Sequence, residues 1–250
     1  MTKILITNDD GIDARGIKYL IEAVRPLGEI MVVAPATEQS GVGVSITLGK
    51  AIQTEDHDLP CQSPAHRVHG TPADCVRLAL HWLKENPPDI IVSGINRGTN
   101  LGCNVLSSGT VGAIIEGRVR GVPGIAFSAS HYTEPNFADY VYDVRSITEH
   151  MLEHPLPDHT ILNVNFPSGT TKGIRFTRQG LGHWDEEFIV NDKAYTIQGG
   201  PKLDGEHPEF EVALFHDGYI TAVPLRIFEL THDDHLDEHK ELFEKRLNGA

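Results

Sequence analysis

The chain has 250 residues, of which 40% are hydrophobic and 22% are charged. A folded chain of this length buries roughly 70–75% of the surface that it exposes when unfolded, so it can form a substantial core. The 21 Lys and Arg residues against 35 Asp and Glu residues give a formal net charge of −14. This charge disfavours the basic surface that binds nucleic acid, and we expect no nucleic-acid duplex as a partner.

The apolar runs of the sequence are all too short for a signal peptide or for a membrane span of roughly 20 residues. We therefore expect a soluble, cytoplasmic protein without a membrane partner. The three cysteines, Cys61, Cys75 and Cys103, are odd in number and lack the CxxC spacing. This pattern predicts reduced thiols and argues against a disulfide framework or a zinc site.

Strand-like and helix-like segments alternate in the first half of the chain. Residues 3–7 and 29–34 are β-branched runs of strand length, and apolar residues recur at helical spacing between them, at Ile17, Leu20, Ile21 and Val24. This pattern predicts a βαβ unit.

A second helix and further strands continue the alternation. Thr71 is the expected N-cap and Pro72 the first residue of the second helix. Residues 89–93 and 125–128 are expected strands, with a helix over 109–120 between them. The alternation predicts an α/β protein with a doubly wound, mostly parallel sheet covered by helices.

After about residue 160 the pattern changes to short strand-like segments divided by Gly and Pro, which predicts a β-rich extension. Residues 231–247 are expected to form a terminal amphipathic helix. We therefore divide the chain into an α/β metal- and phosphate-binding core, residues 1–160, and an extension with the terminal helix, residues 161–250. We expect the extension to mediate oligomerisation as part of the same globular unit.

Oxygen-bearing side chains follow three of the predicted strands, where open α/β sheets bind their ligands. Asp9 and Asp10 follow the first strand, Ser40 lies in the loop after the second, and Asn96 follows the third. Two carboxylates with neutral oxygens suit a hard divalent cation such as Mg²⁺ or Mn²⁺. Gly11 would let the backbone turn, so that the adjacent carboxylates can share one ion.

Two structural alternatives compete with this metal site. The segment Asn8 to Gly11 could be an ordinary polar turn, and either Asp10 or Asp13 could cap the helix that follows.

Donors for an anion are expected at the start of the helix over 109–120. The residues Ser107, Ser108, Gly109 and Thr110 supply hydroxyl groups, free backbone N–H groups and a close-approach glycine. The segment over 40–43, with Gly41, could form a second anion nest. The competing interpretation is that Ser108 merely caps the helix.

Several common motifs are missing from the sequence. It contains no GxxxxGK[ST], GxSxG or HExxH motif, and no GxGxxG follows the first strand. His232, His235 and His239 resemble a metal-binding face, but acidic residues surround them at the start of a helix, where they favour the helix dipole. We expect a structural role for these histidines.

Taken together, these segments resemble the SurE family, the survival-protein 5′-nucleotidases. The matching stretches follow the family order from residue 4 to about residue 225 and include ILITNDDGIDARGI, VVAPATEQSGVGVSIT, HGTPADCVRLAL, DIIVSGINRGTNLG, SSGTVGAIIEG, ILNVNFP and GYITAVPL. The resemblance implies a Rossmann-like core and divalent-metal phosphomonoesterase activity on nucleoside monophosphates. It also implies a swapped C-terminal extension that builds homodimers or homotetramers.

The resemblance also implies roles for single residues. It places the ligands of one divalent metal ion per subunit at Asp9, Asp10, Ser40 and Asn96, the set chosen from the strand ends. It places phosphate contacts at Gly41, Ser108, Gly109 and Thr110. We expect catalytic roles for Asp9, Asp10, Asn96 and Ser108. The sequence departs from the family at Ser107, where Tyr is usual, which leaves the base preference open.

The expected activity is hydrolysis of nucleoside 5′-monophosphates to nucleoside and phosphate, with 3′-nucleotides and short polyphosphate as further candidate substrates. Asp10 could alternatively act as a general base or as the nucleophile. Two other classes of function compete: a non-catalytic sensor that binds metal and nucleotide, and a nicotinamide oxidoreductase, which rests on fold analogy alone.

Overall fold

The computed structural model describes residues 1–250 except 60–62, 131–135, 193, 203–205, 229 and 248–250. Its helices and strands in chain order are β1 (Lys3–Thr7), α1 (Arg15–Val24), η1 (Arg25–Leu27), β2 (Glu29–Pro35), β3 (Thr54–Asp56), β4 (Ala65–Val68), α2 (Pro72–Trp82), β5 (Ile90–Arg97), η2 (Gly102–Leu106), α3 (Gly109–Val119), β6 (Gly124–Ala129), η3 (Phe137–Tyr140), α4 (Val141–Glu153), β7 (Thr160–Phe166), β8 (Ile174–Phe176), β9 (His183–Asn191), β10 (Ala194–Lys202), α5 (Glu211–His216), β11 (Ile220–Arg226) and α6 (Asp233–Leu247).

In the described part of the chain, nine strands form one sheet in the order β3-β4-β2-β1-β5-β6-β7-β11-β8. Strands β4, β2, β1, β5, β6 and β7 pair in parallel, while β3 and β11 pair antiparallel with β4 and β7. The predicted α/β fold with a mostly parallel sheet is confirmed. Since the parallel strands share one direction, their carboxyl ends lie along one edge of the sheet.

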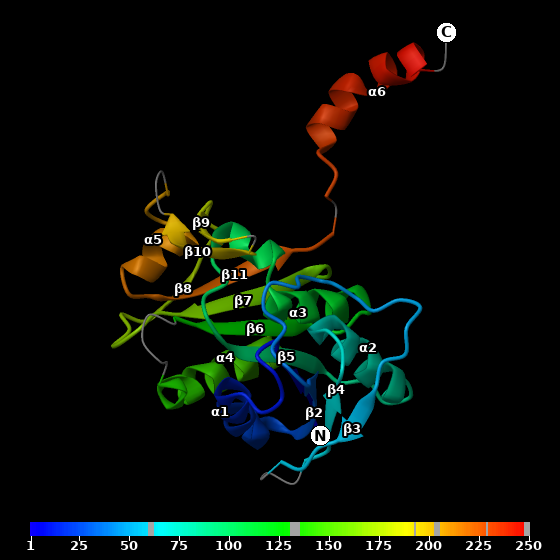
Figure 1. Cartoon of the computed structure of the whole chain (residues 1–250), viewed down its shortest axis with the longest axis vertical. Helices are drawn as coiled ribbons and strands as arrows, with labels where there is room; N and C mark the ends of the chain where they lie inside the picture. The colour runs from blue at the N-terminus through cyan, green and yellow to red at the C-terminus, as the bar shows by residue number, and fades with distance from the viewer. Residues whose placement is uncertain (60–62, 131–135, 193, 203–205, 229, 248–250) are drawn as a thin grey trace.

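Helices cover both faces of this sheet (Figure 1). Successive side chains of a strand point to opposite faces, so Ile4 and Ile6 of β1 join the core under α1 and α4. Leu5, between them, joins a second core with residues of α2 and α3, among them Val76 and Val111. A strand buried on both faces explains why β1 is a continuous apolar run rather than an alternating one.

The elements expected from the first half of the sequence are present. Thr71 caps α2 with its hydroxyl, which accepts a hydrogen bond from the backbone N–H of Asp74, and Pro72 opens the helix as predicted. Strand β5 is longer than expected, because it continues through Gly94 to Arg97. Cys75 is buried and Cys103 exposed, both as free thiols, whereas Cys61 lies outside the described residues.

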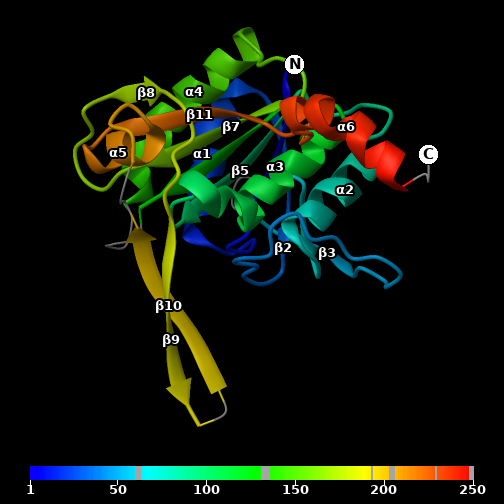
Figure 2. The same ribbon diagram turned by 90° about the horizontal axis from the view of Figure 1, so that it is seen from above.

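The strands after residue 160 divide between two locations. Strands β7 and β11 lie inside the main sheet, so the sheet continues past the domain boundary that we expected from composition. Strands β9 and β10 form a separate antiparallel hairpin that extends away from the sheet (Figure 2). The helix α6 also projects from the body (Figure 1), and its apolar residues Leu236, Leu242 and Phe243 are exposed.

Candidate functional site

The three polar strand ends meet at the carboxyl edge of the sheet. The backbone N–H of Gln39, from the loop after β2, donates to the backbone oxygen of Asp9 at 2.7 Å. The backbone N–H of Arg97, at the end of β5, donates to Oδ2 of Asp10 at 3.1 Å. Gly11 has a φ of +100°, the left-handed conformation that turns the chain just after the two carboxylates.

The first turn of α3 closes over Asp9. The Thr110 hydroxyl donates to Oδ1 of Asp9 at 2.6 Å, and the Asp9 residue is only 4% exposed. A Cβ atom at Gly109 would lie 2.8 Å from Cβ and 3.0 Å from Oδ2 of Asp9. Only glycine lets the helix start this close to the carboxylate, so the segments predicted to bind a metal and an anion lie in direct contact.

Burial disfavours the charged form of both carboxyl groups. It raises the pKa of Asp9 to about 7, with a smaller rise from the Asp10 charge and an opposing contribution from the Thr110 hydrogen bond. Burial also raises the pKa of Asp10, against the hydrogen bond from the Arg97 backbone. A bound divalent cation would supply the positive charge that keeps such a pair ionised.

Asn96 and Ser40 present oxygens to the same edge. Asn96 is 9% exposed, and its Nδ2 donates to the backbone oxygen of Gly98 at 2.7 Å, which leaves Oδ1 for a cation. The residue lies inside β5 rather than in the expected loop, at a register shift between Ser93 and Asn96. The Ser40 hydroxyl donates to Glu38 at 2.7 Å and keeps its lone pairs. Two carboxylates, an amide oxygen and a hydroxyl are the donor set that a hard divalent cation accepts.

The capping alternative for the acidic residues is wrong. Ala14 is the N-cap residue of α1 and makes no side-chain cap hydrogen bond, so neither Asp10 nor Asp13 caps this helix. Asp13 instead contacts Arg67 at 2.6 Å and His57 at 3.2 Å.

Ser108 caps α3, and this role leaves a contact with an anion possible. Its Oγ accepts a hydrogen bond from the backbone N–H of Val111 at 3.1 Å, which is the N-cap interaction of α3. The hydroxyl proton of Ser108 is not used by this hydrogen bond and can still be donated to an anion. Thr110, by contrast, gives its hydroxyl proton to Asp9.

The glycine segment over 40–43 lies beside the start of α3. The backbone N–H of Gly43 donates to the oxygen of Ser107 at 2.9 Å. Gly41 and Gly43 have φ values of +75° and +57°, and a Cβ at Gly41 would meet no atom within 4 Å. The space beside Gly41 is therefore open, while Gly43 holds this segment against Ser107 at the start of α3.

Sequence reasoning missed the residues around the hollow beside Asp10. This hollow of about 220 Å³ is lined by Asp10, Glu38, Arg97 and Phe137, together with the start of α1. Glu38 and Arg97 lie in the same strand-end segments as Ser40 and Asn96, so the strand-end rule could have found them. Phe137 belongs to η3, which no sequence pattern indicated.

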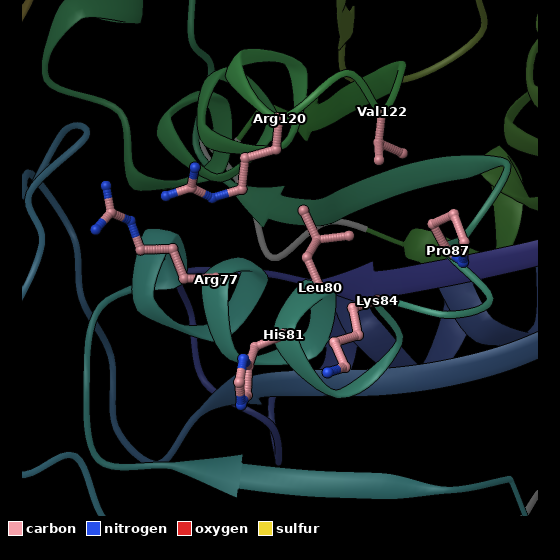
Figure 3. Close-up of a pocket in the computed structure, with 7 residues that line it drawn as sticks. All are labelled: Arg77, Leu80, His81, Lys84, Pro87, Arg120 and Val122. Carbon is pink, nitrogen blue, oxygen red and sulfur yellow. The ribbon is translucent and has the colours of Figure 1, made fainter.

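A larger hollow of about 540 Å³ lies between the C-terminal ends of α2 and α3, near the amino ends of β5 and β6 (Figure 3). Arg77 and Arg120, which line it, both donate to Oε1 of the buried Glu116, at 2.6 and 2.8 Å. This hollow contains none of the predicted site residues.

The histidines of α6 form no metal site with their neighbours. In the part of the chain that the structure describes, no group of three or more His, Cys, Asp and Glu side chains could hold a metal ion. The rings of His235 and His239 lie 4.4 Å apart on the helix. The predicted metal ligands at the sheet edge do not form such a group, because only Asp9 and Asp10 among them are His, Cys, Asp or Glu residues. The other two predicted ligands are Ser40 and Asn96.

These features define an α/β protein with one buried and one half-buried carboxylate at the carboxyl edge of a parallel sheet and a helix N-terminus beside them. The family model described as Survival protein SurE matches residues 4–186. Proteins named 5′-nucleotidase SurE are similar over most of the chain. The protein from Protochlamydia amoebophila is 41% identical over 98% of both chains, and that from Cytophaga hutchinsonii is 44% identical over 88% of this chain and 89% of its own.

The crystal structure of the Sure protein from Aquifex aeolicus matches the fold with a TM-score of 0.85 and 34% identity, over 96% of this chain and 99% of that one. The chain belongs to the SurE family. Among the described residues, no helix is both long and apolar enough to cross a bilayer.

Proposed function

We propose that this protein is a divalent-metal-dependent 5′-nucleotidase that hydrolyses nucleoside 5′-monophosphates to nucleoside and phosphate. The observation that carries the proposal is the contact between Thr110 and the buried Asp9, which joins the pair of adjacent carboxylates to the N-terminus of α3. A carboxylate pair attracts a cation and a helix N-terminus attracts a phosphate, so the site suits a phosphate ester bound beside a metal ion. The names of the curated relatives support this activity.

Asp9, Asp10, Ser40 and Asn96 would hold one Mg²⁺ or Mn²⁺ ion per subunit. When bound, such an ion supplies Lewis acidity toward a phosphate oxygen and lowers the pKa of a water molecule. The protein's part is to keep the ligands in place: Thr110 fixes Asp9, the Arg97 backbone fixes Asp10, and Gly98 orients the Asn96 amide.

The substrate phosphate would lie between the segment of Gly41 and the start of α3. Ser108 donates its hydroxyl proton, and the backbone N–H groups at Gly109 and Gly41 add dipoles that favour negative charge on the phosphate oxygens. Alternatively, Asp10, which lines the hollow of about 220 Å³, would act as the general base that accepts the proton of an attacking water molecule. Asp9, Asp10, Asn96 and Ser108 are thus the proposed catalytic residues.

A phosphate-release panel tests this function. AMP and other 5′-nucleotides are compared with 3′-nucleotides and short polyphosphate, each with Mg²⁺, with Mn²⁺ and with EDTA. We expect phosphate release from 5′-nucleotides that EDTA abolishes, with 3′-nucleotides and short polyphosphate as slower substrates. Saturable AMP binding without phosphate release under any divalent ion would contradict the proposal and favour a metal and nucleotide sensor.

We also propose that the protein forms homodimers or homotetramers through its C-terminal part, in the cytoplasm. The hairpin residues Phe188, Tyr195 and Ile197 are 57%, 67% and 58% exposed, and no residue of α6 is buried. An isolated hairpin and a lone 15-residue helix are both marginal in water, so packing on a second copy would stabilise them. Light scattering should give at least twice the mass of one chain, and a monomer at micromolar concentration would contradict this.

A further inference from the structure

The segment that joins the predicted metal ligand Asn96 to the start of α3 is held by a buried polar network. The backbone N–H of Asn100 donates to Oδ1 of Asn165 at 2.8 Å. The backbone oxygen of Asn100 accepts from Nδ2 of Asn163 at 2.8 Å and from Nδ2 of Asn165 at 3.3 Å. Asn163 and Asn165 belong to β7, so this strand fixes the backbone of Asn100 on both sides.

The amides of Asn163 and Asn165 both donate to one buried carboxylate. Glu211, the first residue of α5, is 0% exposed. Its Oε1 accepts from the Nδ2 atoms of Asn163 and Asn165 at 3.3 Å each, and its Oε2 accepts from the backbone N–H of Gly102 at 2.9 Å. One carboxylate therefore holds Gly102 directly and orients the two amides that hold Asn100.

The residues just before the β9–β10 hairpin hydrogen-bond to the segment between Asn96 and α3 as well. Nε2 of Gln179 donates to the backbone oxygen of Gly102 at 2.8 Å, and the backbone N–H of Cys103 donates to the oxygen of Gly182 at 2.9 Å. Gly102 has a φ of +55°, and a Cβ there would lie only 2.2 Å from the Gly182 oxygen. Gln179 and Gly182 lie just before β9, and Glu211 lies after β10. The segments before and after the hairpin therefore both contact Gly102.

The network reaches the candidate site at Asn100. Its Nδ2 donates to the Ser128 hydroxyl at 2.7 Å and lies 3.5 Å from the Thr110 hydroxyl oxygen. Thr110 in turn donates to Asp9. Asn100 thus links the contacts of Glu211, through its backbone, with Thr110 and Asp9, through its side chain.

We propose that Glu211 is a positioning residue for the candidate site: by anchoring Gly102 and Asn100, it sets the spacing between Asn96 and the N-terminus of α3. The inference rests on the proposed function, because that spacing matters only if the metal and the phosphate bind on either side of it. Glu211 touches neither of them and acts through the loop.

The chemistry of the network explains why a carboxylate is needed there. The Glu211 carboxylate accepts from two amide nitrogens and from the backbone N–H groups of Gly102 and Gly180. A glutamine would turn its own NH₂ group toward one of these donors and leave buried groups unpaired, which is costly. Burial raises the pKa of Glu211 to about 7, and the hydrogen bond from Gly102 opposes that rise.

The test compares Glu211→Gln with Glu209→Gln, which makes the same substitution at an exposed site two residues away. Mn²⁺ affinity is measured by calorimetry without nucleotide, and kcat and KM are measured with AMP at saturating Mn²⁺. We expect about tenfold weaker Mn²⁺ binding and about tenfold lower kcat in Glu211→Gln, with little change in KM. This is the lower end of the loss seen when a direct hydrogen-bond partner of a metal ligand is removed, because Glu211 acts on the ligands only through the loop. Glu209→Gln should match the wild type in all three.

The outcomes separate this inference from the proposed function. A wild-type protein that neither binds Mn²⁺ nor releases phosphate would refute the function. A wild type that does both, with a folded Glu211→Gln variant that matches it, would overturn only the role of Glu211. If Glu211→Gln does not fold, Gln179→Leu removes just the hydrogen bond to Gly102: a smaller loss of Mn²⁺ affinity and kcat supports the inference, and wild-type values refute it.

Discussion

The close approach of α3 to Asp9 leads to a sharp prediction for Gly109→Ala. The added methyl group would lie 2.8 Å from Cβ of Asp9, 3.0 Å from its Oδ2 and 3.1 Å from the backbone oxygen of Gln39. Real Cβ atoms essentially never approach within 3.0 Å, so either the helix start or the Asp9 side chain must shift by several tenths of an ångström. That shift separates the carboxylate from the Thr110 hydroxyl and moves the N-terminus of α3.

The expected loss is larger for activity than for stability. Overpacking costs about 1–3 kcal/mol, and the better helix propensity of alanine returns up to about 1 kcal/mol of that. A misplacement of this kind in a catalytic site can reduce kcat/KM about a hundredfold, which corresponds to about 2.7 kcal/mol of barrier. The two effects therefore differ enough to be measured separately.

The assay pairs AMP hydrolysis with Mn²⁺ and urea unfolding of the same samples. Gly169→Ala is the control, because Gly169 has a φ of +80° and no atom within 4 Å of its added Cβ. That control should lose about 1–2 kcal/mol of stability from backbone strain and keep wild-type kcat/KM. If Gly109→Ala keeps kcat/KM within about twofold of the wild type, the claim that α3 must touch Asp9 for function is wrong.

Three further predictions follow from the same contacts. Asp10→Asn should abolish metal-dependent AMP hydrolysis with the fold intact by circular dichroism, whereas Asp13→Asn, which affects only the contacts with Arg67 and His57, should stay active. Thr110→Val removes the donor to Asp9 and should weaken Mn²⁺ binding about tenfold in calorimetry, while Thr110→Ser should restore it; equal affinities in both variants would contradict the role of that hydroxyl. Because the pKa of Glu211 is raised to about 7, folded protein binds its proton more tightly than unfolded protein, so its contribution to the unfolding free energy falls as pH rises from about 4.5 to about 7. The difference in urea stability between wild type and Glu211→Gln should fall over that range, and a pH-independent difference would refute this.

The candidate site residues at the strand ends could be predicted from the sequence, because they depend only on where each apolar run ends. Asp9, Asp10 and Ser40 each follow an apolar run, and parallel strands bring such positions to one edge whatever the details of packing. The capping of α2 by Thr71 was equally local, since it depends on residues within one turn. The length of β5 could not be predicted from local sequence. Gly94 looks like the start of a turn, and the strand continues past it only because it pairs with β6.

The buried network around Glu211 had no local signal at all. Glu211 contacts Gly102, which lies 109 positions earlier in the chain, and Asn163 contacts Asn100 across 63 positions. Asn163 and Asn165 occupy the polar positions of an alternating strand, which normally face water. Both are nevertheless buried, and their amides contact Glu211 of α5 and the backbone of Asn100. Such long-range polar contacts appear only when the chain is folded, and they carry the positioning role that sequence reasoning missed.

Diffraction from a crystal soaked in Mn²⁺ tests the central claim most directly, because manganese scatters anomalously and marks its own position. We expect one strong anomalous peak per chain, beside the carboxylates of Asp9 and Asp10 and within bonding distance of the side-chain oxygens of Ser40 and Asn96. A fully soaked crystal with no peak there, or with its main peak at the histidines of α6, would contradict it.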